Sequence, residues 1–174
     1  MLGEYLGRGA ERMVFEDRRN PNRVIKIGNG LNAEDAITDF DSLNEAIEYA
    51  LEMNKLPGTV PMSYEGFIEE GGRFIPWFSQ QKVIPMKKVA DPWYTFSKPH
   101  ILPSGRPIIK GKLAAIRYVD DSKTVNKLGY IKNPTKSGLY NLPGYPYLVG
   151  DFGQKNMGFD ELGNLKIFDP LIEL

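Results

Sequence analysis

The sequence predicts an α+β fold, in which an antiparallel sheet of five strands with one helix precedes a region that ends in a β-hairpin. Three observations predict it. Residues 1–30 alternate short β-prone runs with turn residues. Residues 39–55 contain no Gly or Pro and carry apolar residues at helical spacing. Two longer β-prone runs and a terminal hairpin pattern then follow.

Composition limits the classes of protein that this chain resembles. Its 174 residues suffice to bury a core as one globular unit. Lys and Arg total 22 and Asp and Glu total 22, so no excess charge would attract nucleic acid or an acidic membrane surface. The absence of cysteine excludes disulfides and thiolate metal sites, and it fits a reducing compartment. With no run typical of a signal peptide or membrane span, we expect a cytoplasmic protein.

The first three strands are expected in the runs "YLGRG", "MVFED" and "VIKIG", with a turn at "RRNPNR" between the second and the third. The helix is expected over residues 39–55. Its predicted apolar stripe consists of Phe40, Leu43, Ile47, Ala50 and Leu51, and "LPGTVP" ends it.

The fourth and fifth strands are expected in "YEGFIEE" and "RFIPWFSQQKVI", joined by a turn at Gly71 and Gly72. Residues 86–150 are rich in proline, and they suggest one helix near "DDSKTVNKLG". Lone His100, between prolines in this region, reads as a loop residue rather than a catalytic one. The chain closes with "NMGFDE" and "LKIFD" around a turn at 162–164, which predicts a hairpin.

The glycines near the N-terminus follow a phosphate-binding pattern. Gly7, Gly9 and Val14 fit G-x-G-x-x-G-x-V, with Arg12 in place of the third glycine. This stretch resembles the glycine-rich loop of protein kinases, in which backbone N–H groups approach phosphate oxygens. The alternative is that Gly7 and Gly9 only shape a hairpin turn.

Two further residues extend the resemblance to protein kinases. "RVIK" is similar to the family's V-A-I-K strand, which implies that Lys26 pairs with the α and β phosphates of ATP. Glu45 then corresponds to the helix glutamate that forms an ion pair with that lysine. Ser42 and Glu45 also form a capping-box pattern. Glu45 lies away from the predicted apolar stripe, so Glu48 is the alternative partner.

The segment "WFSQQKVIPMK" resembles the kinase strand that leads into the linker between the two lobes. The resemblance implies that backbone groups of about Gln81 to Ile84, including Val83, read the adenine edge there. Pro85 would end the strand there. The resemblance therefore implies one kinase-like domain over residues 1–174. Its antiparallel five-strand N-lobe would cover residues 1–85 and its reduced C-lobe residues 86–174, ending in a catalytic-loop hairpin.

The spacing of three polar residues near the C-terminus fits the kinase catalytic loop. Asn156 follows Asp151 by five residues, and Asp169 follows Asn156 by thirteen, with the predicted hairpin between them. The resemblance implies that Asp151 is the catalytic base and that Asn156 and Asp169 hold Mg²⁺. Lys155 is the nearest cation to the transferred phosphoryl group. The literal "DFG" at 151–153 is then a coincidence.

The departures from the family concern the substrate. Val149 and Gly150 stand where His and Arg precede the catalytic aspartate, and Gly150-Asp151 is closer to aminoglycoside and choline kinases. Only five residues follow Asp169, so the segments that bind a peptide in protein kinases are missing.

We therefore expect a minimal ATP- and Mg²⁺-dependent kinase that acts on a protein or on itself, of the kind found in phages or mobile elements. It would bind no nucleic acid or membrane, and it could form a homodimer. The alternatives are a pseudokinase-like binding module and a small-molecule kinase.

Overall fold

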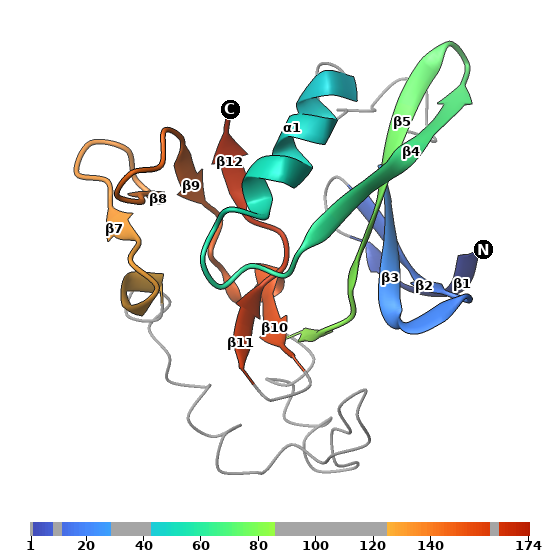
Figure 1. The fold of residues 1–174 in the computed structure, drawn as a ribbon, viewed down its shortest axis with the longest axis horizontal. Coiled ribbons are helices and arrows are strands. Elements are labelled where there is room, and N and C mark those ends of the chain that lie inside the picture. The colour runs from blue at the N-terminus through green and yellow to red at the C-terminus, as the bar shows by residue number, and fades with distance from the viewer. Residues whose placement is uncertain (1, 9–11, 29–42, 86–124, 161–163) are drawn as a thin grey trace. The chain divides into compact units, whose positions relative to one another are not determined.

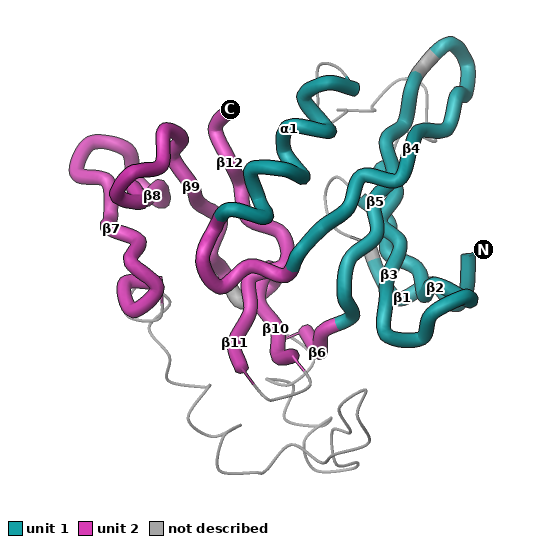
Figure 2. The backbone as a smooth tube through the Cα atoms, in the orientation of Figure 1, with its two compact units in different colours: residues 1–55, 61–82 teal, residues 56–60, 83–174 magenta. Residues whose placement is uncertain are grey.

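The computed structural model describes residues 2–8, 12–28, 43–85, 125–160 and 164–174 of the chain. The chain divides into two compact units, coloured separately in Figure 2. The first comprises residues 1–55 and 61–82, and the second comprises residues 56–60 and 83–174. In the described ranges, no helix is long and apolar enough to cross a membrane.

A five-stranded antiparallel sheet forms most of the first unit (Figure 1). Its strands have the spatial order β1-β2-β3-β5-β4. They are β1 (Leu2–Arg8), β2 (Arg12–Asp17), β3 (Asn20–Gly28), β4 (Met62–Glu70) and β5 (Arg73–Gln81). The strands expected in residues 1–30 and 64–84 are thereby confirmed, although β3 begins three residues before the end of the expected turn "RRNPNR".

The two faces of this sheet differ in chemistry. Val14, Lys26 and Phe78 lie opposite one another on adjacent strands, so their side chains share one face. The other face carries the aliphatic core of Ile25, Ile27 and Ile75, with Phe15 and Trp77 packed against it. A charged residue, Lys26, therefore stands within a strand whose neighbouring residues are buried and apolar.

Helix α1 (Leu43–Met53) is the only described element of the first unit outside the sheet. Its buried face consists of Ala46, Tyr49, Ala50, Glu52 and Met53. The predicted stripe was wrong for Ile47 and Leu51, which are exposed, and right for Ala50, which is buried; Phe40 lies outside the described residues. The stripe was drawn through the largest aliphatic residues, whereas the face that packs is made by two alanines, a tyrosine and a methionine.

Where the structure describes the second unit, at residues 56–60, 83–85, 125–160 and 164–174, it contains two small antiparallel sheets and little helix. The three-stranded sheet has the order β11-β10-β6, and the four-stranded sheet has the order β12-β9-β8-β7. The strands are β6 (Ile84–Pro85), β7 (Ile131–Lys132), β8 (Leu139–Asn141), β9 (Leu148–Gly150), β10 (Met157–Phe159), β11 (Leu165–Ile167) and β12 (Leu171–Glu173). A 3₁₀ turn, η1 (Gln154–Asn156), precedes β10, and residues 125–127 are helical.

The terminal hairpin is confirmed, with Met157 opposite Ile167 and Phe159 opposite Leu165. The predicted fold class is wrong. The described residues are mostly strand, and α1 is the one helix among them that is longer than two turns. They do not show a kinase N-lobe joined to a reduced C-lobe. The physical reason lies in residues 131–150, where Pro, Gly and Asn recur every few residues. Such a stretch cannot sustain a helix, and it folds into strands of two or three residues.

Candidate functional site

Asp151, the predicted catalytic base, belongs to the second unit. Asp151 directly follows β9 and has φ of 55°, in the left-handed region. Within the described ranges it is the one residue other than glycine with such a φ. Asp and Asn adopt this region more readily than other residues, but it still costs free energy. Backbone strain of this kind concentrates at functional sites when the surroundings hold it in place.

Phe152 provides part of that support. Its side chain is only 5% exposed, and its ring lies 4.8 Å from the ring of Tyr130 and 5.1 Å from that of Tyr140, centroid to centroid. The Tyr130 hydroxyl donates a hydrogen bond of 2.9 Å to the carbonyl of Pro57, and burial raises the pKa of Tyr130 well above its ordinary value. The residue after Asp151 is therefore anchored in a buried aromatic cluster.

Asn156 ties the other end of the loop to Asp151. Its side chain is 8% exposed, and its Nδ2 donates a hydrogen bond of 2.8 Å to the backbone carbonyl of Asp151. Its own N–H donates to the carbonyl of Gly153, and its carbonyl accepts a hydrogen bond from the N–H of Phe168, both at 2.9 Å. The bond to Phe168 brings Asn156 beside the residue that precedes Asp169.

Two strand pairs frame these residues. On one side, β9 pairs with β12, with Gly150 opposite Leu171. On the other side, β10 pairs with β11, with Met157 opposite Ile167. The loop 151–156 and the segment 168–170 each run from one strand pair to the other. The structure therefore brings Asp151, Asn156 and Asp169 into one framed region, which we call the two-ladder frame.

The donor set in the two-ladder frame suits a hard cation such as Mg²⁺. Because Nδ2 of Asn156 is occupied by the Asp151 carbonyl, its amide oxygen Oδ1 is the atom left to act as a ligand. Amide oxygens such as this one and carboxylate oxygens such as those of Asp169 are ligands that Mg²⁺ prefers. Over the residues that the structure describes, no group of three or more His, Cys, Asp or Glu side chains is placed to hold a metal ion.

Lys155 lies on the exposed side of the same loop. Its Nζ is 3.1 Å from Oδ2 of Asp151, and both side chains are largely exposed. An exposed ion pair of this kind contributes little to stability and rearranges easily. The pair therefore places a cation next to the Asp151 carboxylate without fixing it there.

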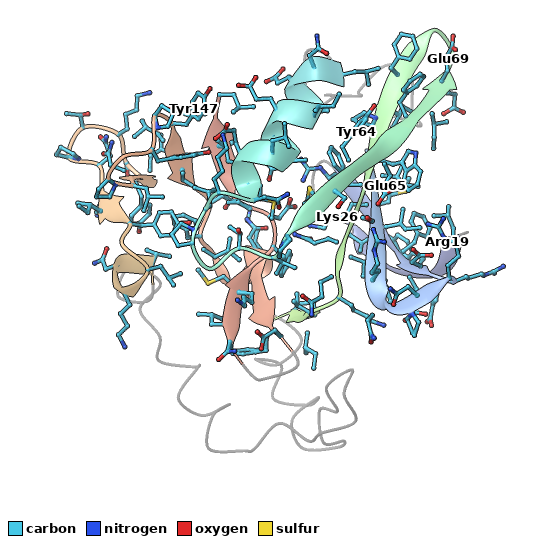
Figure 3. All side chains as sticks on the ribbon, in the orientation of Figure 1. Arg19, Lys26, Tyr64, Glu65, Glu69 and Tyr147 are labelled. Atoms are coloured by element: carbon cyan, nitrogen blue, oxygen red, sulfur yellow. The ribbon has the colours of Figure 1, made fainter. Side chains whose placement is uncertain are left out.

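The predicted phosphate-binding residues lie in the first unit. Lys26 projects from β3, labelled in Figure 3, and is only 3% exposed. It lies opposite Val14 on β2 and Phe78 on β5. Arg12 is also buried, and the carbon at the centre of its guanidinium lies 5.0 Å from the ring centroid of Tyr49 and 5.5 Å from that of Phe78. A face of the sheet thus holds two buried cationic side chains.

Helix α1 presents its glutamates unequally. Glu45 is half-buried, whereas Glu48 is exposed. Glu45 lies one helical turn before Tyr49, whose ring contacts Arg12. Of the two alternative partners for Lys26, Glu45 is thus the more buried. The capping-box alternative involves Ser42, which lies outside the described residues.

Gly7 lies in β1 opposite Val14, and no described atom lies within 4 Å of the position that a Cβ would occupy. Gly9 lies outside the described residues. Gln81 ends β5 opposite Arg23, so it belongs to the first sheet. Val83 and Ile84 belong to the second unit, where Ile84 pairs with Phe159 at one edge of the three-stranded sheet. The predicted adenine contacts are therefore divided between the two units.

Sequence reasoning missed the residues that support the catalytic loop. Phe152 was set aside as part of a chance "DFG", and Tyr130, Tyr140 and strand β12 received no role. The terminal run Leu171-Ile172-Glu173 carried no usable signal for a strand, because it is only three residues long and its first two residues are both apolar. In comparisons with known proteins, no family model and no curated protein matches this chain.

Proposed function

We propose that this protein is an ATP- and Mg²⁺-dependent phosphotransferase, a minimal kinase that acts on a protein or on itself. The observation that carries the proposal is the two-ladder frame, which gathers Asp151, Asn156 and Asp169 from positions eighteen residues apart. The strained backbone of Asp151 adds support, because strain of this kind concentrates at functional sites. A cytoplasmic location, with its supply of ATP, is part of this proposal.

Each residue of the frame has a role in the proposed reaction. The hydroxyl oxygen of the acceptor attacks the γ phosphorus, the bond to the bridging oxygen of ADP breaks, and Asp151 accepts the hydroxyl proton. Asn156 and Asp169 would hold Mg²⁺, which when bound would neutralise charge on the phosphates. Lys155, now beside Asp151, would contact the transferred phosphoryl group. The anchored ring of Phe152 would keep Asp151 in place.

The first unit would bind the phosphates of the nucleotide. Lys26 would pair with them, held by Glu45, and the open space beside Gly7 would let phosphate oxygens approach the backbone. The resemblance to protein kinases remains part of this proposal, and it rests on residue spacing rather than on the fold.

The case for a small-molecule kinase is weakened by the surroundings of Gly150. A Cβ at this position would lie 2.6 Å from Cδ2 of Leu139 and 2.8 Å from the carbonyl oxygen of Gly138. The close approach of β8 therefore explains the glycine before Asp151. The likeness of Gly150-Asp151 to aminoglycoside and choline kinases needs no shared substrate class.

The test is phosphate transfer from labelled ATP, with Mg²⁺, to the protein itself, to a lysate and to small hydroxylated acceptors. We expect Asp151→Asn to lower kcat by at least about 100-fold, as for loss of a general base. Asp169→Asn should abolish the response of the rate to Mg²⁺. Gly7→Ala should fold normally and raise the Kd for ATP.

The matched control is Glu173→Gln. Glu173 is an exposed carboxylate in the second unit whose Oε2 lies 2.9 Å from Nζ of Lys136, so like Asp151 it pairs with an exposed lysine, but it lies outside the loop 151–156 and the segment 168–170. It should retain full activity. If the parent transfers no phosphate but binds ATP, the binding-module alternative gains support. Equal rates for the parent and Asp151→Asn would overturn the proposal.

A further inference from the structure

Arg12 occupies an unusual position for a residue predicted to bind phosphate. It is the first residue of β2, and it is 5% exposed. Its guanidinium lies over the ring of Tyr49, which belongs to α1, and near the ring of Phe78, which belongs to β5. Because β3 separates β2 from β5 in the sheet, the Arg12 side chain extends across the strand that carries Lys26.

Both distances from the guanidinium carbon to the ring centroids are within the range of a cation–π interaction. A buried guanidinium beside aromatic rings is held by cation–π attraction and by packing of its aliphatic stem. Moving it to a phosphate would uncover both rings and require Arg12 to leave its buried place. The geometry therefore suits a structural link better than a phosphate ligand.

The link has a specific consequence for α1. Tyr49 lies four residues after Glu45, so the two side chains are neighbours on the helix surface. Fixing the Tyr49 ring against the sheet fixes the rotation of α1 about its axis. That rotation leaves Glu45 half-buried at the side of the packed face, and it leaves Glu48 exposed.

We propose that Arg12 is a positioning residue, which locks α1 through Tyr49 so that Glu45 stays oriented toward the sheet face that carries Lys26. The inference rests on the proposed phosphotransfer function for its kinetic consequence. Arg12 takes the position of the third glycine in the glycine-rich pattern of protein kinases, and in this proposal its role there is to join the start of β2 to α1.

The test compares three variants in the full chain. Arg12→Met removes the guanidinium and keeps a long apolar stem. Tyr49→Leu removes the ring, and Tyr49→Phe keeps it as the conservative rescue. The control is Arg18→Gln, since Arg18 is an exposed arginine of the β2–β3 turn. Hydrogen exchange of residues 43–53 is measured without nucleotide, and kcat and KM for ATP are measured separately.

We expect Arg12→Met and Tyr49→Leu to speed exchange in α1 at least tenfold. They should lower kcat at least tenfold and change KM for ATP less than threefold, whereas Tyr49→Phe should stay close to the parent. A tenfold rise in KM for Arg12→Met alone, with α1 exchange unchanged, would instead make Arg12 a phosphate ligand. If the parent transfers no phosphate, the proposed function fails, and the exchange results still decide whether Arg12 locks the helix.

Discussion

Replacing Phe152 by alanine is the perturbation that most directly tests the support of the Asp151 loop. The ring is 5% exposed and lies between two aromatic rings at 4.8 and 5.1 Å. Its loss would leave a cavity against Tyr130 and Tyr140, and it would free the loop end that follows the strained Asp151.

The expected cost is about 4 kcal/mol. Deleting a buried phenylalanine ring costs about 3–5 kcal/mol, which includes the transfer and cavity terms and about 0.5–1.5 kcal/mol for each aromatic pair. The control is Phe67→Ala. Phe67 also contacts an aromatic ring, that of Phe74 at 5.0 Å, but its side chain is 47% exposed. Its replacement should cost at most about 1 kcal/mol.

Hydrogen exchange resolved by peptide is the suitable assay, because the two units need not unfold together. A loss of about 4 kcal/mol should accelerate exchange in residues 139–152 by about a thousandfold, at about 1.4 kcal/mol for each factor of ten. Exchange in the first-unit strands should change much less. If Phe152→Ala and Phe67→Ala cost the same, or if Phe152→Ala costs under about 1 kcal/mol, the anchoring role is refuted.

Three further predictions concern single side chains. Gly150→Ala should destabilise by about 1–3 kcal/mol, seen as a lower Tm, because its Cβ would meet the carbonyl oxygen of Gly138 at 2.8 Å. Asp151→Gly should abolish phosphate transfer yet keep the free energy of unfolding within about 1 kcal/mol of the parent, since glycine adopts φ of 55° without strain. Hydrogen bonds from Arg19 lower the pKa of Asp17 below 3.8. The free energy of unfolding of the parent should therefore exceed that of Asp17→Asn above pH 3.8, and this difference should disappear as the pH falls through the lowered pKa. Urea titrations at several pH values measure the difference.

The first unit could be predicted from sequence where strands are long. The strands of residues 1–30 and the two later ones have runs of alternating or apolar residues between turn signals, and these set their existence and order. The rotation of α1 could not be predicted in this way. A stripe that counts Ile47 and Leu51 as core misses the face that is buried, in which Tyr49 contacts Arg12.

The strands of the second unit were harder to predict from sequence because they are short. Strands of two or three residues, such as Leu139–Asn141 and Leu148–Gly150, are too short to show a period of two. The predicted α+β class failed on these strands. The spacing of Asp151, Asn156 and Asp169 around a hairpin was readable, because a hairpin fixes which residues face each other. The aromatic support of Phe152 depends on Tyr130 and Tyr140, which are distant in sequence and carry no local signal.

The pairing of β6 with β10 has a consequence for how the protein folds. Ile84 and Pro85 meet Phe159 and Gly158, and a Cβ on Gly158 would lie 2.6 Å from the carbonyl oxygen of Ile84. Closing this contact encloses a loop of about 70 residues, whereas closing the β10–β11 hairpin encloses about five. The entropic cost of closing the longer loop is therefore larger by about 2 kcal/mol. The hairpin can therefore form early from local contacts, whereas β6 joins late. Strand β6 would therefore be the last strand of the three-stranded sheet to pair.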